Sequence, residues 1–144
     1  MNALFHNEDC TEFFWTQSAI PEGKAGELID RYVDQIADAG TTVLLCNTNA
    51  RRTNYRSDAW EAFWDGYDSA GPDTQPFLAP LAAADIPRYR KGVGNMLAVH
   101  EQGVDYPARV IQRCRQRGVS PWITLRMNDC HNNDAANHPF HGSF

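Results

Sequence analysis

The sequence has no long apolar run and no leader-like start. No stretch approaches the ~18 consecutive apolar residues of a membrane-spanning helix, and the first residues lack the basic-then-apolar order of a secretory signal. These absences predict a cytoplasmic chain with no membrane partner, while export of a longer parent protein stays open.

An excess of basic residues is also missing. The chain carries 13 lysines and arginines against 18 aspartates and glutamates, which gives a formal net charge of −5. Nucleic acids and anionic membranes are bound by basic surfaces that displace counterions. The balance therefore argues against a nucleic-acid partner and favours a small or neutral one.

Paired cysteines and cofactor motifs are absent as well. The four cysteines, at positions 10, 46, 114 and 130, form no C-x-x-C pair, so we expect buried free thiols. Gly92-Val93-Gly94 is too short for a phosphate-binding loop, and no serine lies in a nucleophile elbow. We therefore expect no cofactor.

What is present is a pattern that occurs twice: an amphipathic helix, a glycine, a short apolar strand, then asparagine or aspartate. The first copy places a helix before Gly40 and a strand at residues 41–46, and the second a helix from Asp105 to Gly118 and a strand at 122–125. A further strand is expected at residues 3–5. Apolar strands separated by helices predict an α/β fold with a parallel sheet covered on both faces.

The segment 51–104 is a long insertion after the second strand, and it must carry structure of its own. Asp58 and Glu61 resemble a capping box, and aromatic residues follow at helical spacing, which predicts a helix near residues 58–67. This aromatic stripe fits packing on a core or, alternatively, a platform for sugar rings: Trp60, Phe63, Trp64 and Tyr67. We also expect some helix between residues 95 and 102.

Polar residues follow all three expected strands, and ligands of parallel α/β proteins bind at the carboxyl ends of strands. Carboxylates mixed with amides and one arginine suit a polyhydroxylated ligand, although such residues also cap helices and form turns. Taken together, they predict a substrate-binding rim: Asn7, Glu8, Asp9, Asn47, Arg126, Asn128, Asp129 and His131.

The C-terminal histidines offer an alternative. His131, His138 and His141 lie beside Asp129 and include residue types that bind zinc. Their spacing fits no established zinc pattern, so we expect no metal. A metal-dependent barrel hydrolase or lyase stays open as a rival interpretation.

Residues 4–9, 45–50 and 122–131 resemble the start of uncharacterised bacterial TIM-barrel proteins classed with the glycoside hydrolases. The most specific element is Leu125-Arg126-Met127-Asn128-Asp129, followed by His131. The resemblance implies that residues 1–144 are the first, incomplete part of a single (β/α)8 barrel domain. It implies a carbohydrate ligand and a glycoside hydrolase activity in the full-length protein.

Two consequences follow from this resemblance. The catalytic acid and nucleophile would lie on later strands, so the catalytic residues are unknown and the chain alone is expected to be inactive. A sheet of three strands would leave an exposed edge, which predicts self-association. A non-catalytic carbohydrate-binding protein is the remaining alternative.

Overall fold

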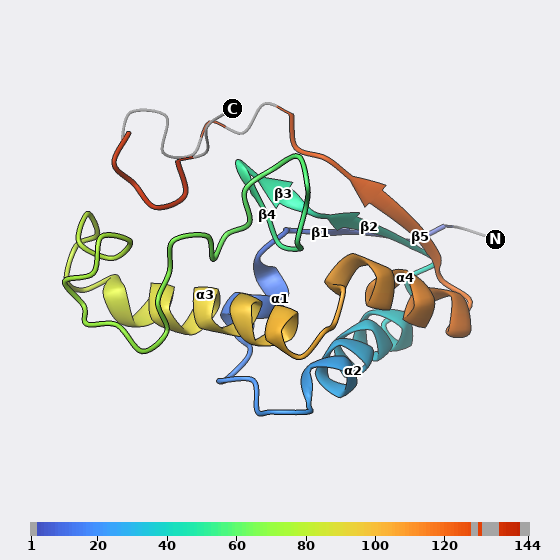
Figure 1. Ribbon diagram of the computed structural model, residues 1–144. Helices are drawn as coiled ribbons and strands as arrows, with labels where there is room; N and C mark the ends of the chain where they lie inside the picture. Colours follow the sequence, from blue (N-terminus) through green and yellow to red (C-terminus); the bar gives the residue numbers. More distant parts are fainter. Residues whose placement is uncertain (1–2, 128–129, 131–135, 142–144) are drawn as a thin grey trace.

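Three parallel strands form the centre of the structure, a computed structural model that describes residues 3–127, 130 and 136–141 (Figure 1). The strands are β1 (Phe5–Glu8), β2 (Val43–Asn47) and β5 (Ser120–Thr124), in the order β1-β2-β5. Asn7 pairs with Leu45, and Leu45 pairs with Trp122. The predicted α/β class with a parallel sheet is therefore confirmed.

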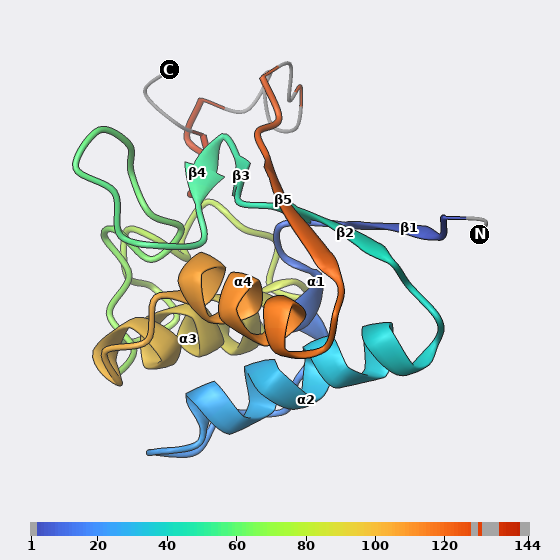
Figure 2. The same ribbon diagram turned by 90° about the vertical axis from the view of Figure 1, so that its right-hand side faces the viewer.

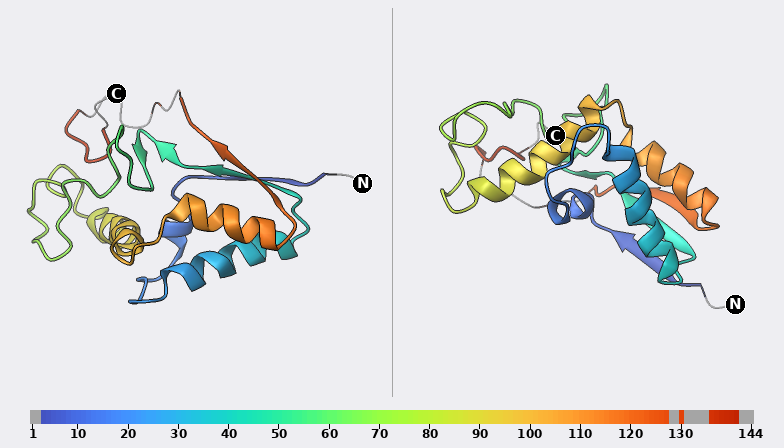
Figure 3. Two further views of the ribbon diagram at one scale, coloured as in Figure 1. Left: turned by 45° about the vertical axis from the view of Figure 1, so that its right-hand side comes forward. Right: turned by 90° about the horizontal axis from the view of Figure 1, so that it is seen from below.

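Four helices lie on one face of this sheet (Figures 1 and 2). They are α1 (Glu12–Thr16), α2 (Ala25–Asp38), α3 (Ile86–Glu101) and α4 (Tyr106–Gln116). A short antiparallel pair, β3 (Asn49–Ala50) and β4 (Arg52–Thr53), follows directly after β2. The left view in Figure 3 shows the sheet and the helices as two layers.

Helices α2 and α4 form where the repeated pattern predicts them. Ile29 and Val33 of α2 and Val110 of α4 are fully buried, which gives each helix one apolar face. The Asp105 side chain accepts a hydrogen bond from the amide of Ala108 at 3.0 Å and so caps α4. Ion pairs join α4 to α2, with nitrogen–oxygen distances of 2.5–2.7 Å. The pairs are Arg109 with Asp30, Arg113 with Asp34, and Arg117, the C-cap of α4, with Asp34 and Asp38.

The other face of the sheet is not covered by the described residues, so the prediction of a sheet covered on both faces is wrong for this part of the chain. Side chains alternate along a strand, so Val43 and Leu45, which alternate with the buried Leu44 and Cys46, point away from the helices together with their register partners on β1 and β5. Phe5 and Trp122 lie on this uncovered face and are each 61% exposed.

The predicted helix at residues 58–67 is wrong. Thr53 bridges to Ala62 instead, and the amide of Phe63 donates to the Thr53 carbonyl at 2.9 Å. The Asp65 side chain accepts from the Ala62 amide, and Gly66 has a φ of 87° that ends any helical turn. The aromatic residues therefore lie in an irregular segment and not in a helix, and two of them, Phe63 and Trp64, are buried there.

The helix expected within residues 95–102 is real but longer, because α3 already begins at Ile86. Pro87 is tolerated in its first turn, where no intrahelical donor is needed. The insertion predicted at 51–104 thus contains β4, an irregular segment and α3.

Cys10, Cys46 and Cys114 are buried thiols that form no disulfide, as expected, whereas Cys130 forms no disulfide and is exposed. Among the described residues, no helix combines the length and apolar character needed to cross a membrane.

Candidate functional site

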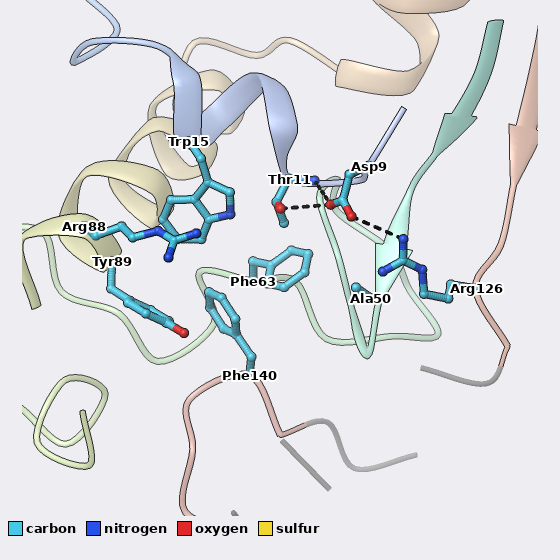
Figure 4. A pocket seen from close by; sticks show the side chains of 9 residues that line it. All are labelled: Asp9, Thr11, Trp15, Ala50, Phe63, Arg88, Tyr89, Arg126 and Phe140. Atoms are coloured by element: carbon cyan, nitrogen blue, oxygen red, sulfur yellow. Dashed lines mark hydrogen bonds and ion pairs between the residues drawn. The ribbon is translucent and has the colours of Figure 1, made fainter. Parts of the chain in front are cut away.

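A cleft of about 260 Å³ lies at the carboxyl-terminal edge of the sheet (Figure 4). This is the edge at which the sequence predicts ligand binding. The cleft combines charged residues with aromatic rings, and its lining residues are Asp9, Thr11, Trp15, Ala50, Phe63, Arg88, Tyr89, Arg126 and Phe140.

Several elements bring these residues together. Asp9 directly follows β1, Ala50 ends β3, and Arg126 follows β5 by two residues. Trp15 belongs to α1, while Arg88 lies in the first turn of α3. The cleft is therefore assembled from the strand ends on one side and from two helices on the other.

Asp9 is the centre of the polar side. Its Oδ1 accepts hydrogen bonds from the amide and the hydroxyl of Thr11, at 3.1 and 3.0 Å. Its Oδ2 lies 3.2 Å from Nη2 of Arg126. Partial burial opposes ionisation, but the Thr11 hydrogen bonds and the Arg126 charge outweigh it, so the pKa of Asp9 lies below its usual value.

Aromatic rings form the opposite side. The Trp15 and Tyr89 rings lie 5.6 Å apart and are half-buried, whereas Phe63 and Phe140 are buried beneath them with centroids 4.7 Å apart. The Tyr89 ring also packs against the Phe140 ring, with 5.1 Å between the ring centroids. The half-buried rings leave part of their surface open to a ligand.

Gly92 fixes the position of Trp15. A Cβ atom at this position would overlap the Trp15 ring, so only glycine lets α3 approach the indole this closely. The glycine that resembled part of a phosphate loop has a packing function.

Arg88 lies at the rim of the cleft. Its guanidinium is held over the Trp15 ring, 5.4 Å from the ring centre. The side chain is exposed and makes no ion pair with a carboxylate in the part of the chain that the structure describes.

The asparagines at the strand ends mainly hold the backbone. Asn49 Oδ1 accepts from the amide of Arg126 at 2.8 Å, and Asn49 Nδ2 donates to the Arg126 carbonyl at 3.2 Å. Asn47 is buried, and its Oδ1 accepts from the Asn49 amide at 3.2 Å. These bonds fix the segment that carries Arg126 next to β3.

The structure brings only part of the predicted rim together. Asp9 and Arg126 meet in the cleft, and Asn47 supports the turn beside it. Asn7 lies on the uncovered face of the sheet, and Glu8 is buried on the helical face. Asn128, Asp129 and His131 lie outside the described residues.

Glu8 occupies an apolar interior. It is 2% exposed and accepts a hydrogen bond from the hydroxyl of Tyr106, and burial raises the pKa of its carboxyl to about 7. Its neighbour in sequence, Asp9, points into the cleft, so the two carboxylates do not share one site.

His138 is engaged in local contacts. Its Nε2 lies 3.2 Å from the Tyr89 hydroxyl, and its Nδ1 accepts from the amide of Phe140 at 3.1 Å. Burial together with the charge of Arg52 lowers its pKa, so the imidazole is neutral near pH 7. The described residues contain no group of three metal-ligating side chains.

Sequence reasoning missed most of the aromatic and helical wall. The run Phe13-Phe14-Trp15, only a few residues after β1, carried a usable signal, because loops at the strand ends build active-site walls. Arg88 and Tyr89 gave none, since their place depends on how α3 packs.

No protein-family model matches the chain, and no curated protein is significantly similar to it in sequence.

Proposed function

We propose that the cleft binds a carbohydrate, and that the chain forms the substrate-binding part of a glycoside hydrolase-like (β/α)8 barrel. The observation that carries the proposal is the combination of Asp9 and Arg126 with the half-buried rings of Trp15 and Tyr89 around one cleft. Sugars offer hydroxyls for the polar side and a C–H face for the aromatic side.

The electrostatics of the polar side suit hydroxyl groups. Asp9 is ionised and can accept hydrogen bonds, while Arg126 can only donate them. A sugar hydroxyl both donates and accepts, so neighbouring hydroxyls can bridge such a pair. The cleft volume of about 260 Å³ suits one small ligand more than a large cofactor.

The topology supports the barrel part of the proposal. The three strands of the sheet lie side by side in the order in which they occur in the chain, and the described helices cover one of its faces. A barrel has this order, whereas a doubly wound sheet has helices on both faces. The exposed Phe5 and Trp122 lie on the face that a barrel would enclose.

The proposal assigns binding to this chain and leaves turnover unassigned. Glycoside hydrolysis uses two opposed carboxyl groups, ~5–5.5 Å apart for retention or ~6.5–9.5 Å for inversion. Among the described residues, Asp9 is the one carboxylate that lines the cleft. Asp9 therefore positions substrate hydroxyls.

Titration with methyl glycosides, followed by NMR or calorimetry, tests the proposal. A panel of neutral sugars (glucose, galactose, mannose, xylose) and uronic acids should contain at least one ligand. Trp15→Ala should weaken its binding about tenfold, because the ring contact is lost. Trp15→Phe, which keeps an aromatic face, should retain most of the affinity.

Trp122→Ala is the matched control, since this tryptophan lies on the uncovered sheet face away from the cleft. It should leave the affinity unchanged. Asp9→Asn should weaken binding while thermal unfolding reports an intact fold. Absence of binding across the panel, or equal affinity of Trp15→Ala and wild type, would overturn the proposal.

A further inference from the structure

The structure assigns an anion-binding position to Arg88, and we infer that the ligand of the cleft is an acidic sugar. The inference rests on the proposed function and narrows its substrate class. The ligand is a monosaccharide unit that carries a negatively charged group at the end facing Arg88, with its hydroxyls toward Asp9.

Arg88 lies in the first turn of α3, where a cation opposes the helix dipole, and Asp85 at the N-cap supplies the acidic residue at this end of the helix. No described carboxylate pairs with Arg88. Its neighbour Arg90, by contrast, is held by Asp73 at 2.6 Å and by the Gly71 carbonyl. Arg88 is thus the arginine of this turn whose charge is left for a ligand.

The Trp15 ring orients the guanidinium of Arg88. The Arg88 guanidinium lies over the Trp15 ring, 5.4 Å from the ring centre, which holds it at the rim of the cleft, and the N–H groups of a guanidinium lie along its edges. Those edges match the two oxygens of a carboxylate, which arginine binds through two parallel hydrogen bonds.

The two charged sides of the cleft define the orientation of the ligand. Figure 4 shows Arg88 with the Trp15 and Tyr89 rings on one side and the Asp9–Arg126 pair on the other, with the Phe63 ring between them. The Asp9 carboxylate repels a second anion, so the anionic group belongs at the Arg88 end. A uronic acid has this asymmetry, with one carboxylate and several hydroxyls on one ring.

The test compares methyl glucuronide with methyl glucoside, which differ in the carboxylate. We expect the wild-type chain to bind the glucuronide at least tenfold more tightly. Arg88→Gln should abolish this preference, so that the variant binds the glucuronide and the glucoside with equal affinity. Lys91→Gln removes the same charge from an exposed position on α3 that does not line the cleft, and it should keep the preference.

Further arms identify the source of the charge. If glucose 6-phosphate binds more tightly than the glucuronide, the group that Arg88 binds is a phosphate. If acetate or inorganic phosphate binds as tightly as the sugars, the acidic-sugar assignment is overturned. Equal binding of glucuronide and glucoside, or a preference that survives Arg88→Gln, would also overturn it and leave the proposed function standing. Absence of binding by every sugar would instead overturn the proposed function.

Discussion

At the scale of single residues, Glu8 makes the stability of the chain depend on pH between pH 4.5 and about 7. It is fully enclosed between the sheet and the helices, with the Tyr106 hydroxyl and the Cys46 thiol against its carboxyl. Burial raises its pKa from 4.5 to about 7, so the folded chain favours the protonated, neutral form.

This shift makes the chain less stable as the pH rises. The folded state binds the Glu8 proton more tightly than the unfolded state, so the stabilisation is fully present below pH 4.5 and is lost on the way to about pH 7. The free energy of unfolding should fall by about 3 kcal/mol across this window and then level off. Urea unfolding at a series of pH values measures it.

Glu8→Gln is the control, because glutamine is neutral at every pH and has nearly the same shape. Its unfolding free energy should not show the fall between pH 4.5 and 7. The difference between the two curves isolates Glu8 from other titrating groups such as His138, whose lowered pKa acts in the opposite direction. Parallel curves for the variant and the wild type would contradict the account.

At the scale of elements, the contact between α1 and α3 positions the aromatic side of the cleft. Gly92 on α3 faces the Trp15 ring of α1, and a methyl group there would overlap it. Gly92→Ala should therefore destabilise the chain by about 1–3 kcal/mol and weaken sugar binding, because the ring must move. Thermal unfolding and the glycoside titration measure the two effects.

Gly94→Ala is the matched control on the same helix. A Cβ at Gly94 would have the Tyr67 hydroxyl as its nearest neighbour, at 4.0 Å, which is an ordinary contact. This change should stabilise α3 by up to about 1 kcal/mol through helix propensity and leave binding intact. If both alanine variants behave alike, Gly92 does not position Trp15.

Elements with a regular local pattern could be predicted from the sequence. Helices α2 and α4 have clear apolar faces, and glycines follow both, at Gly40 and Gly118 with φ of 86° and 69°. The aromatic stripe at residues 60–67 has the spacing of a helix. The segment is not helical, because its backbone pairs with Thr53 instead. Long-range pairing of this kind leaves no local signal.

The polar side of the cleft could likewise be predicted from the sequence, whereas the aromatic side could not. Asp9 and Arg126 could be predicted because parallel strands bring their carboxyl ends to one edge of the sheet. Asn7 and Glu8 do not join them in the cleft, because alternation along β1 sends their side chains to opposite faces of the sheet. Arg88 and Tyr89 depend on where α3 docks, which no spacing in the sequence encodes.

At the scale of the whole molecule, the uncovered sheet face governs association. Phe5 and Trp122 are exposed on this face, and β1 and β5 are edge strands. We expect the chain to associate with itself as its concentration rises. Trp122→Lys should reduce this association, because the charge is costly to bury between two sheets, and sedimentation velocity over a range of concentrations measures it.

Gln112→Lys adds the same charge on the exposed side of α4, away from the sheet. It should leave self-association unchanged. Association that is equally sensitive to both lysine substitutions would indicate a net-charge effect, and the sheet face would then not be responsible.

The central claim is that the cleft at the carboxyl end of the sheet binds a sugar. A crystal structure of the chain with methyl glucuronide tests it most directly. The account predicts a pyranose ring against Trp15 and Tyr89, with hydroxyls on Asp9 and Arg126 and the carboxylate on Arg88. A sugar bound elsewhere on the molecule, with the cleft empty at saturating concentration, would contradict it.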